Sequence, residues 1–99
     1  MTRRVVITRN LMDASKFKAL PIDVVVTASA APDALSEADL VILDLATGID
    51  PGSVVGENRR VVAYGSHVEV DVMEQARAVG CSEVVPRSKM FRDLASWMA

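Results

Sequence analysis

Residues 39–45, Asp-Leu-Val-Ile-Leu-Asp-Leu, decide the fold of this chain. The apolar run between Asp39 and Asp44 is too short for an ordinary helix. It is typical of a strand that is buried on both faces, as at the centre of a parallel sheet. Ligands of open α/β sheets collect at the carboxyl ends of the strands. Asp44, at the exit of the strand, is therefore the first candidate for function.

Composition narrows the class of protein. The 99 residues suffice for one domain, expected over residues 1–99. With 51% hydrophobic but 4% aromatic residues, the core must be mainly aliphatic. A net charge of −2 provides no field to recruit nucleic acid, and no apolar stretch reaches the roughly 18 residues of a membrane span. The lone Cys81 excludes an intrachain disulfide and favours a cytoplasmic protein.

Apolar runs alternate with segments of helical spacing along the whole chain. Asn10 is a candidate cap for a first helix that continues to Leu20 and is stopped by Pro21, and Pro32 suits the first turn of a second helix. Residues 49–58 have room for at most one or two helical turns, so the third crossover is shortened. Strands are expected at residues 4–8, 23–28, 39–45, 60–65 and 83–86.

The last two helices have their own start and stop signals. Ser66 and Glu69 match a capping box for a helix that Gly80 ends. Ser88 is a candidate cap for the final helix, which carries Phe91, Leu94, Trp97 and Met98 on one stripe.

Strands that alternate with helices predict an α/β three-layer sandwich around a five-stranded parallel sheet. The flavodoxin-like strand order 2-1-3-4-5 suits five such units joined by right-handed crossovers. In that order the loops after strands one, three, four and five converge on one edge of the sheet. The candidate site residues there are Thr8, Arg9, Asn10, Asp44, Gly65, Ser66, His67, Arg87 and Ser88.

These segments together resemble the receiver domain of bacterial two-component response regulators over nearly the whole chain. Residues 39–45 are similar to the strand that carries the phosphoacceptor aspartate, which places Asp44 at that position. Residues 60–67 are similar to the fourth strand and its switch residue. Residues 76–88 are similar to the fourth helix, the fifth strand and the position of the family's lysine. The resemblance implies a stand-alone receiver fold that acts in signalling through protein contact.

Three working positions of that family are occupied differently here. Arg9-Asn10 occupies the place where receivers carry the acidic pair that holds Mg²⁺. Gly65 replaces the small hydroxyl residue that receivers have at the end of the fourth strand, and Arg87 replaces their lysine. Magnesium needs oxygen ligands, usually from one or two carboxylates. We therefore expect a pseudo-receiver with no cofactor, no metal and no catalytic residue; magnesium enters only if Asp44 is an atypical phosphoacceptor.

A structural role for Asp44 is the alternative to phosphorylation. In that role Asp44 is expected either to pair with Arg9 or Arg87 or to cap a turn. A two-point ion pair with one of these arginines would lock the site without a metal. A second alternative is an anion-binding module or small enzyme with a pocket at Arg9, His67 and Arg87. His67 has no neighbouring ligand or nucleophile in a recognised arrangement, and Ser66 is expected to act as the helix cap.

A protein partner, either another protein or a second copy of the chain, is expected on the face made by the fourth helix, the fifth strand and the fifth helix. The resemblance implies that surface, and aromatic side chains are favoured at such contacts. The candidate contact residues are Tyr64, Val68, Phe91 and Trp97.

Overall fold

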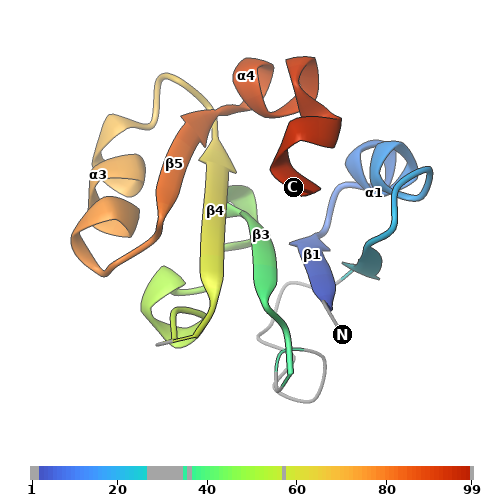
Figure 1. Cartoon of the computed structure of the whole chain (residues 1–99). Coiled ribbons are helices and arrows are strands. Elements are labelled where there is room, and N and C mark those ends of the chain that lie inside the picture. The colour runs from blue at the N-terminus through green and yellow to red at the C-terminus, as the bar shows by residue number, and fades with distance from the viewer. Residues whose placement is uncertain (1–2, 27–34, 36, 57, 99) are drawn as a thin grey trace.

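A computed structural model describes residues 3–26, 35, 37–56 and 58–98. Five parallel strands form one sheet in the order β2-β1-β3-β4-β5, which confirms the predicted topology (Figure 1). The central β3 is one residue shorter at each end than predicted, and residues 27–28 of the expected second strand lie outside the described part. The strands are β1 (Arg4–Thr8), β2 (Asp23–Val26), β3 (Leu40–Asp44), β4 (Arg60–Gly65) and β5 (Glu83–Pro86).

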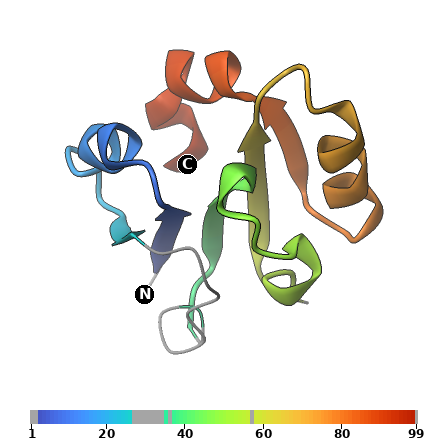
Figure 2. The ribbon, with the colours of Figure 1, turned by 180° about the vertical axis from the view of Figure 1, so that it is seen from behind.

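Helices cover both faces of the sheet (Figures 1 and 2). α1 (Leu11–Phe17), α4 (Arg87–Arg92) and the C-terminal 3-10 turn η3 (Leu94–Met98) lie on one face. The other face carries α3 (Val70–Ala78) and the 3-10 turns η1 (Leu45–Thr47) and η2 (Pro51–Ser53).

The two faces of the sheet belong to two separate hydrophobic clusters, as the alternation of side chains along a strand requires. In β1, Val5 and Ile7 join the cluster under α3, whereas Val6 joins the cluster under α1 and α4. All five residues of β3 are buried, as expected for a central strand covered on both faces. Asp44, the last residue of β3, is therefore buried at the edge of the sheet where the strands have their carboxyl ends.

The first helix confirms its predicted cap but not its predicted length. The side chain of Asn10 accepts hydrogen bonds from the backbone N–H groups of Met12 and Asp13 at 2.9 and 3.2 Å. The helix ends at Phe17, so the predicted continuation to Leu20 is wrong; the chain leaves in a turn closed by a bond from the Leu20 N–H to the Phe17 carbonyl. The expected helix at Pro32 lies outside the described residues.

Two predicted caps are wrong. Glu69 makes no side-chain cap bond to Ser66; the Ser66 hydroxyl instead accepts weakly from the Val68 N–H at 3.5 Å, and α3 starts one turn later than a Ser66 cap requires. Ser88 lies inside α4, because the extended backbone of Pro86 lets the helix begin at Arg87 directly. Gly80 has the left-handed φ of 106° predicted for a helix stop.

The third crossover contains only 3-10 turns in its described residues, which fits its predicted shortness. Gly48 adopts a φ of 78° where η1 ends. In the described part of the chain, no helix is both long and apolar enough to cross a membrane.

Candidate functional site at the carboxyl edge of the sheet

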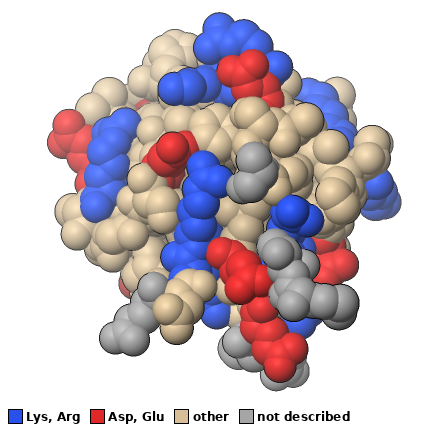
Figure 3. All heavy atoms as spheres, viewed as in Figure 1, with Lys and Arg blue, Asp and Glu red and all other residues tan. Residues whose placement is uncertain are grey.

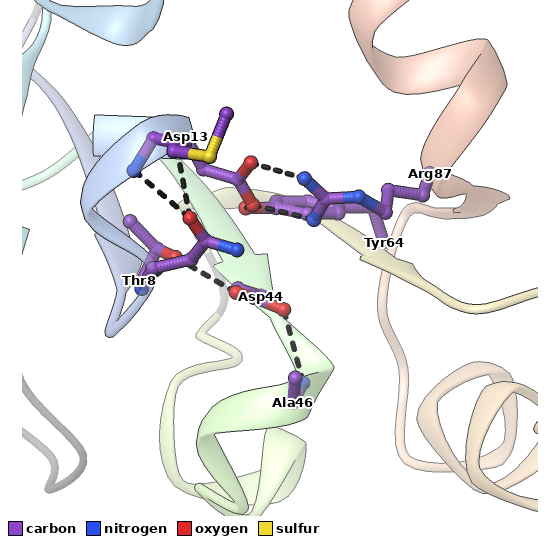
Figure 4. Close-up of polar contacts among 8 residues, drawn as sticks. Thr8, Asp13, Asp44, Ala46, Tyr64 and Arg87 are labelled. Atoms are coloured by element: carbon purple, nitrogen blue, oxygen red, sulfur yellow. Dashed lines mark hydrogen bonds and ion pairs between the residues drawn. The ribbon is translucent and has the colours of Figure 1, made fainter. Parts of the chain in front are cut away.

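Asp44 is 2% exposed at the end of β3, and groups of the chain itself occupy both of its carboxylate oxygens (Figure 4). The Thr8 hydroxyl, from the end of β1, donates to Oδ2 at 2.7 Å. The Ala46 N–H donates to Oδ1 at 3.0 Å, so the carboxylate also caps η1. The structural role predicted for Asp44 therefore takes the form of a turn cap.

A second buried carboxylate, Asp13, forms an ion pair with Arg87 at the same edge of the sheet. Asp13 is fully buried on α1 and receives a two-point contact from the Arg87 guanidinium (Figure 4). Nη1 donates to Oδ2 at 2.5 Å and Nη2 donates to Oδ1. The Tyr64 hydroxyl donates to the same Oδ2 at 3.1 Å. Planar forks of this kind are the strong geometry for arginine–carboxylate pairs.

The predicted ion pair between Asp44 and Arg9 or Arg87 is wrong. Arg9 is exposed, and Arg87 pairs with Asp13 because α1 brings that carboxylate between β4 and α4. The sequence reasoning missed Asp13 altogether. A signal was present, since Asp13 lies four residues before the buried Phe17 and therefore on the inward face of the helix.

Burial and charge shift two pKa values in this network. The pKa of Tyr64 is raised far above its usual value, first by burial and then by the neighbouring Asp44 carboxylate. The pKa of Arg87 is also raised, first by its hydrogen bond with Asp13. Tyr64 is therefore a neutral hydrogen-bond donor, and Arg87 a cation, at neutral pH.

The remaining predicted site residues are spread around this network. Gly65 is buried at the end of β4, Ser66 is half-buried, and His67 and Ser88 are exposed. A hollow of about 490 Å³ brings His67 and Arg87 together, as the anion-pocket alternative requires, but Lys16 takes the place predicted for Arg9. Its lining residues are Lys16, Ser66, His67, Arg87, Ser88 and Phe91.

Two of the four predicted contact residues cannot present their side chains to a partner. Tyr64 is fully buried and Trp97 is 7% exposed, because both belong to the cluster under α1 and α4. The Trp97 indole N–H donates to the Met90 carbonyl at 3.1 Å, which fixes the ring inside. Phe91 is half-buried, and Val68 is 72% exposed.

The donors at this edge do not fit the magnesium ion that the resemblance to receivers implies. Mg²⁺ is usually held by one or two carboxylates together with water. Here the Asp44 oxygens accept hydrogen bonds from Thr8 and Ala46, and the Asp13 oxygens face a guanidinium. Among the residues that the structure describes, no three His, Cys, Asp or Glu side chains gather as a metal would require.

Comparison with solved structures finds chains of similar fold. The chain is similar to the signal receiver domain of a putative Luxo repressor protein from Vibrio parahaemolyticus, with a TM-score of 0.55 and 18% sequence identity. The match covers 99% of this chain and 91% of that one. No protein-family model and no curated protein matches the sequence. The likeness in structure and the strand order together show that the chain has a receiver-like fold.

Tyr64 is the only tyrosine of the chain, so its ionisation can be followed directly by absorbance near 295 nm. Because its pKa is raised in the fold, the native protein binds this proton more tightly than the unfolded chain, whose tyrosine titrates near 10. Stability is therefore lost as pH rises above that value. We expect no tyrosinate signal until the circular dichroism of the fold is also lost.

The same protein in guanidinium chloride provides the control, with tyrosinate forming near pH 10. Tyrosinate that forms near this pH while the native circular dichroism persists would contradict the buried hydrogen bond to Asp13.

Proposed function

We propose that this chain is a receiver-like signalling domain that works through contact with another protein and is not switched by phosphorylation of Asp44. One observation carries the proposal: both carboxylates of the carboxyl edge are already satisfied by groups of the chain. Asp44 is bound by Thr8 and Ala46, and Asp13 is bound by Arg87 and Tyr64.

The surroundings of Asp44 disfavour phosphoryl transfer to it. Each oxygen already accepts a hydrogen bond, from the Thr8 hydroxyl or the Ala46 N–H, which makes it a weaker nucleophile, and the side chain is almost inaccessible to a phosphoryl donor. Charge that develops on the phosphoryl oxygens must also be neutralised, which metal ions commonly do. Arg87 supplies the positive charge of this network, and its guanidinium already neutralises Asp13.

Exposed apolar side chains beside the site favour a protein as the partner. Leu11 and Met12, in the first turn of α1, are each 73% exposed, and Val68, in the connection after β4, is 72% exposed. All three lie in segments that follow the carboxyl ends of β1 and β4. We name Leu11, Met12 and Val68 the rim residues. Burying apolar surface of this kind drives protein association.

The absence of phosphorylation is tested with acetyl phosphate and Mg²⁺. Because the Asp44 oxygens are engaged within the fold, we expect the intact mass of the protein to stay unchanged, with an active receiver domain as the positive control. A mass gain of one phosphoryl group that disappears in Asp44→Asn would identify Asp44 as an atypical phosphoacceptor and overturn this half of the proposal.

The contact surface is tested with the double variant Leu11→Gln, Met12→Gln in cells that depend on this protein. Both side chains are exposed, so the free energy of unfolding should change by less than about 0.5 kcal/mol. We expect the variant to lose the biological response nonetheless. Val26→Gln, which alters an exposed apolar residue of β2, is the matched control and should retain it. A fully active double variant would contradict the assignment.

A further inference from the structure

We infer that the hollow between α1, α4 and the connection after β4 binds a small organic phosphate monoester without forming a covalent bond. This inference is independent of the proposed signalling role. The hollow is about 490 Å³, within the range of small-molecule sites and larger than a bare phosphate needs. Its described lining holds two cations, one histidine, two hydroxyls and one phenyl ring, and no carboxylate.

The charge of the hollow is unbalanced at Lys16. Arg87 is neutralised from behind by the buried Asp13, but Lys16 has no carboxylate within ion-pair distance among the described residues. Its ammonium instead lies 4.6 Å from the centroid of the Phe91 ring. An anion in the hollow would give this cation a partner of opposite charge.

Arg87 is already oriented for such a ligand. A guanidinium carries five N–H groups, and the two-point contact with Asp13 uses only two of them. The side chain is 41% exposed, so its remaining donors are accessible, while Asp13 and the Phe91 ring hold its plane in place. The guanidinium therefore loses little conformational freedom when it binds a phosphate, which favours affinity.

Further hydrogen-bonding groups surround the two cations. Ser66 and Ser88 contribute hydroxyls, and His67 contributes at least one N–H in either tautomer. These donors come from the loop after β4 and from α4, so they approach a ligand from two elements. A phosphate group has enough oxygens to accept from several of them at once.

The apolar part of the lining argues for an organic ester over the free ion. Phe91 is half-buried and packs on Phe17 and Tyr64 with ring centroids 5.5 Å away from each. The ring is therefore a fixed wall, and the aliphatic stems of Lys16 and Arg87 extend its apolar surface. On the face drawn in Figure 3, basic and acidic side chains are interspersed. The described lining of the hollow contains basic side chains and no carboxylate.

The probe is phenyl phosphate, titrated into the ¹⁵N-labelled protein, with inorganic phosphate and phenol in parallel. We expect saturable shifts of the Ser66, His67, Ser88 and Phe91 amide signals, with the tightest binding for phenyl phosphate. Lys16→Gln should weaken it about tenfold, as expected for the loss of one charged hydrogen bond. Lys18→Gln removes the same charge from an exposed residue at the end of α1 and should leave the affinity unchanged.

Three results would overturn the inference. The first is the absence of saturable shifts at those four amides. The second is an equal loss of affinity in the Lys16 and Lys18 variants, which would mean that the phosphate is attracted by the net charge of the protein and not by a specific site. The third is equal affinity for inorganic phosphate, which would mean an adventitious ion only. Thermal unfolding of each variant verifies that the fold is intact.

Discussion

The ion pair between Asp13 and Arg87 is the interaction on which the carboxyl edge of this sheet depends. An unpaired carboxylate as deeply buried as Asp13 would be costly, and breaking such a pair destabilises a protein far more than leaving it intact contributes. The pair joins α1 to α4 across the end of β4, and Tyr64 completes the coordination of the carboxylate. The pair also engages Arg87, one of the two arginines that the sequence offered as partners for Asp44.

Asp44 is consequently satisfied by neutral groups. A hydroxyl from β1 and a backbone N–H from η1 occupy its oxygens, so the carboxylate holds the ends of two strands and the turn that follows them. The position that resembles a phosphoacceptor is thus used as a structural cap. The exposed rim residues and the hollow lined by Lys16 and Arg87 lie in segments beside this closed centre.

The sequence predicted the strands because valine-rich runs and the buried β3 depend on local patterns alone, and the strand order followed from the right-handed crossovers that join alternating strands and helices. It also predicted the Asn10 cap and the Gly80 stop, which are set within one turn of chain. It failed at the site because pairing between Asp13 and Arg87 joins residues 74 positions apart, and only the packing of α1 against α4 decides it. The same reason hid the burial of Tyr64 and Trp97, since aromatic residues suit cores and contacts equally.

A double-mutant cycle tests the central claim most directly, because it measures which carboxylate Arg87 serves. Arg87→Met is combined with Asp13→Asn in one cycle and with Asp44→Asn in the other, and unfolding free energies are taken from urea titrations. We predict a coupling of about 2 kcal/mol for Asp13, reduced from fully buried pairs by the exposure of Arg87, and less than about 0.5 kcal/mol for Asp44. A larger coupling with Asp44 than with Asp13 would contradict the account.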